Sequence, residues 1–368
     1  MAEELETDIN GGKISKHLQS WYMANNRDLP WRESRDPYII WISEVILQQT
    51  KVDQGIAYFH RFTERFPDVE SLAEADEQEV LKLWQGLGYY SRARNLHKAA
   101  RQVIQSFNGQ LPKTYRELIR LSGVGEYTAA AIASIAYDLP HAVVDGNVYR
   151  VLSRLFEIET PIDTSHGKKQ FAEIAEQLLD HANPSIHNQA MMELGALVCT
   201  PKNANCELCP LQTSCMAYKY GTTYDFPKKK KKNKNTVTQN RYLNYFNVIQ
   251  GDFVFIKKRT DADIWRNLYD FPLVETSCPV EIDDLSQNID FQNLFQNNDK
   301  IDFVHTTRIK HILTHRILFV NFYQVSLQET ANFNEEGKYL KIKLAELHNY
   351  PVSGLIGKYL ERFPLKGL

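Results

Sequence analysis

Apolar residues recur at helical spacing through most of the chain between residues 9 and 198. Asp36 and Pro37 suit the N-cap and the first position of one such helix, and Trp41, Val45 and Ile46 belong to its apolar face. The same spacing predicts helices over residues 9–26, 36–50, 52–66, 77–84, 165–180 and 187–198, with another after the glycine turn at 86–88. This part of the chain is therefore predicted to be all-α.

The pattern changes after residue 221. Residues 222–240 include the lysine run Lys228–Lys232 and carry no apolar periodicity, which predicts a linker. The run is either a solvated tether or a loose contact to phosphates. From Tyr242 on, alternating aromatic and β-branched residues predict strands, and residues 318–327 are the clearest of these. The sequence thus predicts a multidomain protein, with an all-α domain over 1–221, a linker over 222–240 and an α+β domain over 241–368.

Composition narrows the class of protein only slightly. The 368 residues are 24% charged with a net charge of −2, so overall charge does not mark a nucleic-acid binder. No apolar run approaches the roughly 18 residues that a membrane helix needs. The first residues, MAEELETDIN, are acidic and polar and unlike a secretory signal. We therefore expect a cytoplasmic protein with no membrane partner.

Four of the five cysteines lie close together in the sequence. They have the spacing C-x6-C-x2-C-x5-C, which allows four thiolates to surround one soft metal centre: Cys199, Cys206, Cys209 and Cys215. On spacing alone, a zinc ion and an iron–sulfur cluster both remain open. Cys278 stands apart and is expected to be structural or incidental.

Two carboxylates stand out as candidates for acid–base chemistry. Glu44 lies within an apolar helix, where loss of solvent would raise the pKa of its carboxyl group and keep it protonated. Asp145 precedes a predicted helix, whose unpaired N–H groups should hold it ionised. Each also has a plainer interpretation, as a solvent-facing helix glutamate and as an ordinary N-cap aspartate.

The stretch over residues 121–151 identifies a family. L-x-G-V-G-x-Y-T-A at 121–129, followed by V-D-G-N-V-x-R-V at 144–151, resembles the helix-hairpin-helix DNA glycosylases, and most of all the MutY-type adenine DNA glycosylases. The resemblance implies a hairpin motif over 113–137 and base excision repair of double-stranded DNA by a monomer. It also implies association with the nucleoid if the source is bacterial. It implies removal of adenine opposite 8-oxoguanine or guanine by hydrolysis. The cysteine spacing resembles the 4Fe-4S loop of the endonuclease III and MutY families, which favours the cluster over zinc.

The resemblance also assigns roles to four residues. It implies that Glu44 protonates adenine at N7 and then activates water, and that Asp145 stabilises, or transiently bonds to, the sugar cation. It implies that Tyr127 and Asn147 support Asp145 and the water or sugar near it. Endonuclease III-like lyases carry a lysine at the position of Tyr127, so a glycosylase without lyase activity is favoured. A glycosylase-lyase and a DNA-binding protein without catalysis are the alternatives.

Further positions match the family's contacts to DNA and to the base. Gly123 and Gly125 match the phosphate-binding hairpin. Gln48 and Tyr89 match the side chains that wedge into the base stack, and Leu87 lies in the same G-L-G-Y-Y run as Tyr89. The remaining matches line the adenine pocket: Arg32, Leu47 and Gln189.

The second domain resembles the Nudix-type C-terminal domain of MutY proteins. It lacks the R-E-x-x-E-E box of working Nudix hydrolases, so we expect no pyrophosphatase activity. Leu313-Thr314-His315 matches the Phe-Ser-His loop with which the family reads oxoguanine, with Leu and Thr replacing Phe and Ser. The plainer interpretation of these three residues is the end of a strand.

Overall fold

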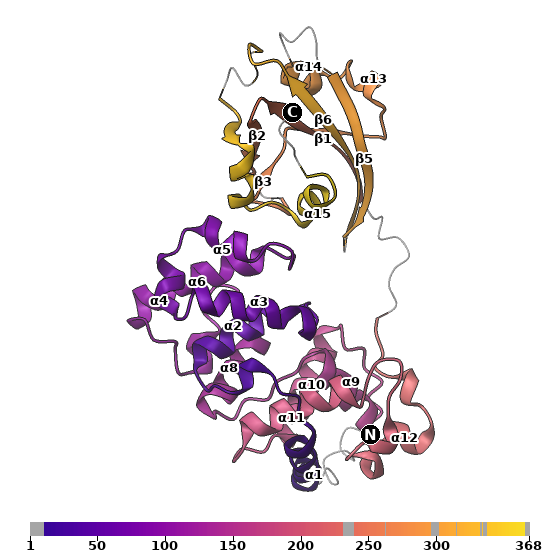
Figure 1. Cartoon of the computed structure of the whole chain (residues 1–368). Helices are drawn as coiled ribbons and strands as arrows, with labels where there is room; N and C mark the ends of the chain where they lie inside the picture. Colours follow the sequence, from indigo (N-terminus) through magenta and orange to yellow (C-terminus); the bar gives the residue numbers. More distant parts are fainter. Residues whose placement is uncertain are drawn as a thin grey trace. The chain divides into compact units, whose positions relative to one another are not determined.

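The computed structural model describes residues 11–230, 239–261, 263–295, 302–313, 315–331, 333 and 337–364. The chain forms two compact units, a helical one and one built on a β-sheet (Figure 1). The helical unit takes in the chain up to Glu74 and the segment from Asn95 to the linker, and the sheet unit takes in Ala75–Arg94 and the chain after the linker. None of the described helices is both long and apolar enough to cross a bilayer.

The helices of the first unit follow the predicted apolar pattern closely. Their bounds are α1 (Gly11–Asn25), α2 (Pro37–Leu47), α3 (Val52–Arg65), α4 (Val69–Glu74), α6 (Ser91–Phe107), α7 (Tyr115–Leu118), α8 (Glu126–Tyr137), α9 (Gly146–Leu155), α10 (Ser165–Leu178), α11 (Pro184–Leu197) and α12 (Met216–Tyr220). Short 3-10 turns occur at η1 (Pro30–Arg32), η2 (Cys206–Leu208), η3 (Gln212–Ser214) and η4 (Thr223–Asp225). The hairpin motif consists of α7, which is a single helical turn, and α8, joined by residues 119–125.

Two packing arrangements of the first unit position the candidate site. Helices α1, α9, α10 and α11 share one apolar core, to which Leu18, Leu152, Phe171 and Leu194 contribute. Helix α2 packs against α3 and α8 and is buried over most of its length, from Tyr38 to Ile46. A helix that is apolar all round is expected to be buried, and this burial carries Glu44 into the interior.

Local signals fix where these helices begin and end. Asp36 caps α2 by accepting a 2.8 Å hydrogen bond from the amide of Tyr38. Helix α2 ends at Leu47, earlier than predicted, because Gln48 leaves helical geometry and Gln49 has a φ of 58°. Helix α8 ends where Asp138 adopts the left-handed conformation.

The second unit is built on a mixed sheet with the strand order β3-β2-β1-β6-β5. Its strands are β1 (Gln239–Gln250), β2 (Phe253–Lys258), β3 (Tyr269–Asp270), β4 (Leu273–Thr276), β5 (Asp302–Ile312), β6 (Arg316–Leu327) and β7 (Leu340–Lys343). Strand β1 runs parallel to β6, whereas β5 and β6 form an antiparallel hairpin. The helices are α13 (Ile282–Leu285), α14 (Ile289–Phe295), η5 (Leu344–Asn349) and α15 (Gly354–Arg362).

Consecutive residues of β1 anchor the helices on its two faces, as the two-residue period of a strand requires. Phe246 packs edge-on against Phe291 and Phe295 of α14. Tyr245 stacks on Phe322 of β6, which in turn stacks on Tyr359 of α15 at 4.1 Å between ring centroids. Figure 1 accordingly shows α14 and α15 on opposite sides of the sheet.

The unit boundaries differ from the predicted ones in two places. The segment Ala75–Arg94, with α5 (Glu77–Leu83), groups with the second unit. There it makes hydrogen bonds that sequence periodicity cannot reveal, from Tyr90 Oη to the Val352 carbonyl and from Gln78 Nε2 to the Asn267 carbonyl. The first part of the predicted linker lies on the helical unit, since the Lys230 amide donates to Asp163.

Candidate active site

Helices α2, α8 and α11 and the start of α9 surround a cavity of about 540 Å³. This size suits a purine base, since small-molecule sites usually enclose about 300–1,000 Å³. The cavity brings together all four predicted catalytic residues and four of the predicted DNA-contacting residues: Glu44, Tyr127, Asp145, Asn147, Arg32, Leu47, Gln48 and Gln189. Residues more than 100 positions apart in the sequence, such as Glu44 and Asp145, thus line the same cavity.

Glu44 is buried, with 9% of its surface exposed. Tyr127 of α8 donates a 2.6 Å hydrogen bond to Glu44 Oε2 and lies 3.6 Å from the sulfur of Met192. Burial raises the pKa of Glu44 to about 7, with the Tyr127 hydrogen bond lowering it and the charge of Asp145 raising it. The carboxyl group is therefore poised between its acid and base forms near neutral pH, and the solvent-facing interpretation is wrong.

Asp145 caps α9 as the sequence predicts. Its Oδ1 accepts from the amides of Asn147 at 2.9 Å and Val148 at 2.8 Å, and its Oδ2 accepts from Asn147 Nδ2 at 2.8 Å. Burial nevertheless raises the pKa of Asp145, against the lowering effect of these bonds and of Arg150. The predicted influence of the helix start is present, but the structure makes burial the larger effect.

Tyr127 and Asn147 divide between the two carboxylates. Asn147 donates a hydrogen bond to Asp145, as expected, whereas the Tyr127 hydroxyl group donates to Glu44. Arg150 continues the chain of contacts, donating to Asn147 Oδ1 at 2.8 Å and to the Cys199 carbonyl at 2.6 Å. The Tyr127 hydroxyl group thus reaches Glu44, and its expected support of Asp145 and of the water or sugar nearby stays a prediction.

A charged cluster at the same cavity was missed by the sequence reasoning. Glu193 of α11 is 1% exposed and forms ion pairs with both Arg27 and Arg32. Gln189, one turn earlier on α11, accepts from the Tyr22 hydroxyl at 3.2 Å. The signal available in the sequence was the i, i+4 spacing of Gln189 and Glu193, which places them on one helix face.

Four further predicted DNA-contacting residues lie between helices, and Leu87 is the buried one beside the exposed Tyr89, Gly123 and Gly125. Gly123 has a φ of 76°, and a side-chain carbon there would lie 2.6 Å from Asn95 Cβ, so the hairpin requires glycine at this position. Gly125 precedes α8 and has open space around it. Tyr89 has a φ of 46° and is 55% exposed, whereas Leu87 is buried at 8%. Exposure suits Tyr89 to a wedge better than Leu87.

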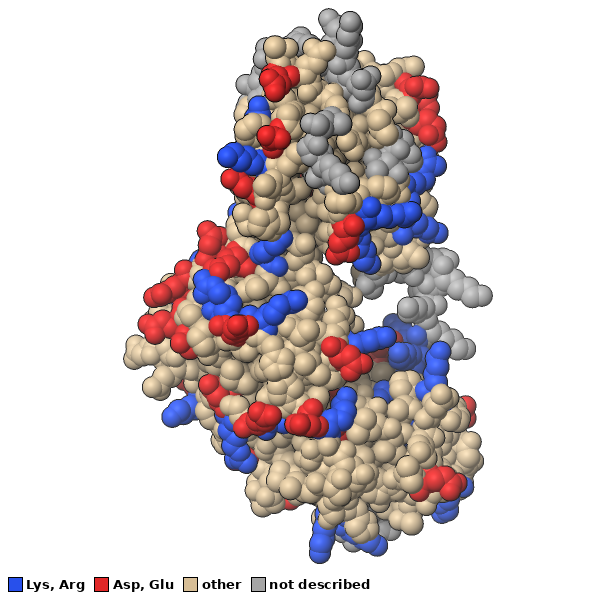
Figure 2. Space-filling view, in the orientation of Figure 1, with Lys and Arg blue, Asp and Glu red and all other residues tan. Residues whose placement is uncertain are grey.

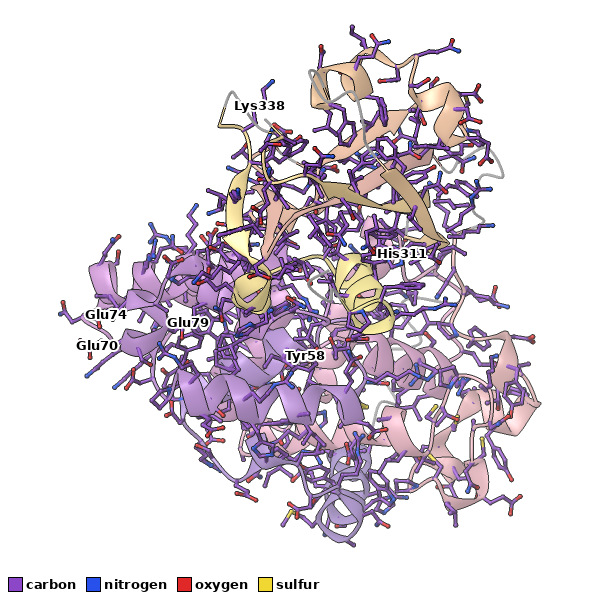
Figure 3. All side chains as sticks on the ribbon, turned by 45° about the horizontal axis from the view of Figure 1, so that its top comes forward. Tyr58, Glu70, Glu74, Glu79, His311 and Lys338 are labelled. Atoms are coloured by element: carbon purple, nitrogen blue, oxygen red, sulfur yellow. The ribbon has the colours of Figure 1, made fainter. Side chains whose placement is uncertain are left out.

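Two of the predicted lesion-reading residues, Leu313 and His315, lie at the tip of the β5–β6 hairpin. The Leu313 amide donates to the Arg316 carbonyl at 2.8 Å, which closes the turn, and His315 is exposed. Thr314 lies outside the described residues. Figure 3 labels His311 on β5, two residues before the turn. Leu313 and His315 therefore belong to a hairpin tip and not simply to the end of a strand.

The four clustered cysteines line one cavity of about 30 Å³. Among the described residues, no three His, Cys, Asp or Glu side chains already converge on an ion position. Arg154, which is 2% exposed, places Nη1 3.3 Å from Cys199 Sγ. Burial raises the pKa of the Cys209 thiol to about 12. Four thiols around one space, with a buried guanidinium to balance thiolate charge, fit a thiolate-bound metal cluster.

On the face that Figure 2 shows, surface charge does not by itself single out a binding surface. Figure 2 shows Lys and Arg interspersed with Asp and Glu on the face in view. Glu70 and Glu74 of α4 are exposed, and Figure 3 shows them projecting outward. Acidic side chains of this kind disfavour contact with phosphates, so the candidate DNA contacts rest on the cavity and the glycine hairpin.

Comparisons with known proteins identify relatives of both parts of the chain. Residues 42–179 match the HhH-GPD superfamily of base excision DNA repair proteins, and residues 244–362 match the NUDIX domain family. The adenine DNA glycosylase of Buchnera aphidicola subsp. Baizongia pistaciae is 34% identical over 324 residues, which is 87% of this chain and 88% of that protein. The adenine DNA glycosylase of Homo sapiens is 46% identical over 209 residues, which is 54% of this chain and 38% of that protein.

Solved structures resemble the helical part of the chain. A thermostable thymine-DNA glycosylase has a TM-score of 0.54 and 28% identity, and the match covers 58% of this chain and 100% of that one. Endonuclease III in a non-covalent complex with DNA has a TM-score of 0.50 and 24% identity, covering 58% of this chain and 99% of that one. The second likeness concerns the fold alone.

Proposed function

Because the chain belongs to the adenine DNA glycosylases, enzymes that hydrolyse N-glycosyl bonds in base excision repair, we propose that it removes adenine mispaired with 8-oxoguanine or guanine. It does so on double-stranded DNA, as a monomer and without cutting the strand. The observation that carries the proposal is the placement of Glu44 and Asp145 on one purine-sized cavity. The two carboxylates have different surroundings, which lets them divide the chemistry.

Glu44 supplies the proton in this proposal. Adenine leaves poorly as an anion, so proton transfer to N7 accompanies cleavage of the bond between N9 and C1′, whose electrons pass to the base. The Tyr127 hydroxyl group occupies Glu44 Oε2, so Oε1 is the oxygen available to carry the proton toward the base. After the base departs, the Glu44 carboxylate accepts a proton from water as its oxygen bonds to C1′, which regenerates the acid.

Asp145 stabilises the sugar cation. Positive charge develops on C1′ and the ring oxygen as the bond breaks, and a fixed anion nearby lowers the energy of that state. The amides of Asn147 and Val148 and the Asn147 side chain hold the carboxylate in one orientation. An anion that is already oriented spends no energy on reorganisation during the reaction.

The absence of a lysine nucleophile supports hydrolysis without strand cleavage. Among the described residues that line the cavity there is no lysine, and Tyr127 stands at the position where endonuclease III-like lyases carry one. A Schiff base to the sugar requires an amine, which this cavity does not offer. We therefore propose a monofunctional enzyme that leaves an intact abasic strand.

Four further assignments belong to the proposal. A 4Fe-4S cluster held by Cys199, Cys206, Cys209 and Cys215 would act as a structural staple for the loop that follows α11. His315, at the tip of the β5–β6 hairpin, reads the base opposite adenine together with Leu313 and Thr314. Tyr89 and Gln48 wedge into the stack, and the hairpin at Gly123 and Gly125 holds phosphate.

A duplex cleavage assay tests the proposal. Oligonucleotide duplexes carry adenine opposite 8-oxoguanine, guanine or thymine, and each product is analysed with and without alkali. We expect cleavage after alkali for the first two duplexes, none for the third, and intact strands without alkali. His315→Ala should lower the preference for 8-oxoguanine over guanine by about tenfold, as loss of a base-edge contact does. Strand scission without alkali would refute the monofunctional assignment.

A further inference from the structure

The cavity contains a buried carboxylate that the proposed chemistry does not use. Glu193 of α11 lies against two arginines, Arg27 and Arg32, that border the same cavity as Glu44. We propose that Glu193 is a positioning residue, which fixes both guanidinium groups so that they hold the extruded base against Glu44. This inference rests on the proposed function, because it assigns a role within the adenine pocket.

Five hydrogen bonds converge on the Glu193 carboxylate. Oε1 accepts from the Arg27 amide at 2.8 Å, from Arg27 Nε at 2.9 Å and from Arg32 Nη1 at 3.1 Å. Oε2 accepts from Arg27 Nη2 at 2.7 Å and from Arg32 Nη2 at 2.8 Å. Both arginines thus bind both oxygens, and such two-point pairing fixes the plane of each guanidinium group as well as its distance.

The carboxylate is held in its charged form despite its burial. Burial by itself would raise the pKa of Glu193, but the hydrogen bonds from Arg27 and Arg32 outweigh it and lower the pKa to about 2. Glu193 therefore stays ionised across the pH range in which Glu44 titrates. A constant negative charge can hold the two cations without becoming a second proton donor in the cavity.

Arg32 extends the arrangement to Gln189 through Tyr22. The Arg32 guanidinium lies over the Tyr22 ring at 5.4 Å from its centroid, and the Tyr22 hydroxyl donates to Gln189 Oε1. Gln189 Nε2 donates to Ser185 Oγ at 3.2 Å. Three parts of the chain, α1, the η1 turn and α11, are therefore joined through charged and polar contacts beside the cavity. Such a network gives the pocket one geometry before the base arrives.

The pairing also restricts what Arg32 can do. Arg32 Nη1 donates to the Arg27 carbonyl at 2.9 Å in addition to Glu193. A guanidinium group held at this many points keeps its remaining donors aimed in a fixed direction. Without Glu193, Arg32 would be free to turn toward DNA phosphates, and the base would lose one wall of its pocket.

The test uses the full-length protein and three variants. Glu193→Gln keeps the volume of the side chain but replaces an acceptor oxygen with a donor, Glu193→Asp keeps the charge, and Arg32→Met removes one of the held cations. Single-turnover adenine release and duplex affinity are measured separately. We expect Glu193→Gln to slow release by about 10- to 100-fold, as displacement of positioning groups does. Its dissociation constant for the duplex should change less than about threefold, because phosphate contacts dominate affinity.

A double-mutant cycle separates positioning from a merely structural role. If Glu193 acts through Arg32, the Glu193→Gln change should slow adenine release much less in the Arg32→Met background than it does in the wild type. Glu193→Asp should recover part of the rate. A wild-type rate in Glu193→Gln, or full multiplication of the two losses in the double variant, overturns the inference.

The outcomes also distinguish this inference from the proposed function. If Glu193→Gln fails to fold, Glu193→Asp provides the test. Its carboxylate is drawn back by one methylene, so adenine release at the wild-type rate would refute the positioning role of Glu193. A wild-type protein that releases no adenine would refute the proposed function. An active wild type with an unaffected Glu193→Gln variant would refute the role of Glu193 alone.

Discussion

The hydroxyl group of Tyr127 donates a 2.6 Å hydrogen bond to Glu44 Oε2, joining α8 to the buried centre of α2. This bond lowers the pKa of Glu44, while burial and the charge of Asp145 raise it, and the balance lies at about 7. A carboxyl group balanced in this way is still largely an acid at pH 6.5 and largely a base at pH 8. The position of this balance should be visible in the kinetics.

Tyr127→Phe should shift the alkaline limb of the pH–rate profile, where the rate of adenine release falls with rising pH, to higher pH. In the wild type, release should fall as pH rises through about 7, since Glu44 then loses the proton that the base requires. Removing a hydrogen bond that lowers the pKa of Glu44 raises that pKa, so the fall should begin later. Single-turnover rates between pH 5 and 9 provide the measurement.

Tyr137→Phe is the matched control for this change. Tyr137 also lies on α8, but its hydroxyl group donates to the Leu111 carbonyl and does not touch Glu44. Its alkaline limb should coincide with that of the wild type. A limb that stays in place or moves to lower pH in Tyr127→Phe would contradict the assignment of Glu44 as the titrating acid.

Glu44→Gln should stabilise the protein at alkaline pH. Because the folded-state pKa of Glu44 is raised from 4.5 to about 7, the folded state binds more protons than the unfolded state between these values. Stability therefore falls as pH rises through this window, by up to about 3 kcal/mol at roughly 1.4 kcal/mol per pKa unit. The amide of the variant carries no charge at any of these pH values, so its folding stability should not fall in this way as pH rises.

Thermal unfolding at two pH values measures the effect. At pH 8 we expect a higher Tm for Glu44→Gln than for the wild type, and at pH 5 the difference should nearly vanish. An equal or lower Tm for the variant at pH 8 would mean that the Glu44 carboxyl group is not held in a desolvated place.

Gly195→Ala should impair adenine release without contacting the substrate. A side-chain carbon at Gly195 would lie 2.5 Å from Asn147 Cβ and 3.0 Å from the Asn147 backbone, so α9 has to shift. The shift displaces Asn147 and, through its hydrogen bonds, Asp145. Misplacement of a group that acts on the transition state should slow single-turnover release by about tenfold or more.

Gly12→Ala provides the comparison, since a side-chain carbon there meets nothing within 4 Å. That change lies within α1 and should leave the rate unchanged, with a small gain in stability of about 0.5–1 kcal/mol. A full rate in Gly195→Ala would show that the close approach of α11 to α9 does not set the position of Asp145.

Cys206→Ala should remove the cluster that we propose. Four thiols line one small cavity, and three of them pack against the apolar core shared by α1, α9, α10 and α11. The variant should lose bound iron, visible absorbance and much of its soluble yield. Cys278→Ala, at an exposed cysteine outside this group, should keep all three. Stoichiometric zinc without iron in anaerobically purified wild type would contradict the iron–sulfur assignment.

Much of the catalytic geometry could be predicted because it follows from local rules. The apolar run around Glu44 predicts a buried carboxyl group, and the order Asp145-Gly146-Asn147 predicts an N-cap, which the structure confirms. The contacts of Glu193 could not be predicted, since Arg27 and Arg32 lie more than 160 residues away in the sequence. A pattern of apolar spacing does not state which charged side chains meet.

The difference between local sequence signals and contacts of distant residues also explains which boundaries of the two units could be predicted. The composition break near residue 222 identifies the change from helices to strands, and β1 begins at Gln239. Ala75–Arg94 groups with the sheet unit, where it makes hydrogen bonds to Asn267 and Val352. These partners lie 189 and 262 residues after Gln78 and Tyr90 in the sequence. No feature of that segment's own sequence specifies them.

Adenine release from an 8-oxoguanine–adenine duplex, measured in single turnover for the wild type and Glu44→Gln, tests the central claim most directly. The wild type should release adenine and leave a strand that breaks only after alkali. Glu44→Gln should bind the duplex normally and release adenine at least about 100-fold more slowly, because an amide cannot protonate the departing base. Release by the variant at close to the wild-type rate would contradict the assignment of Glu44 as the catalytic acid.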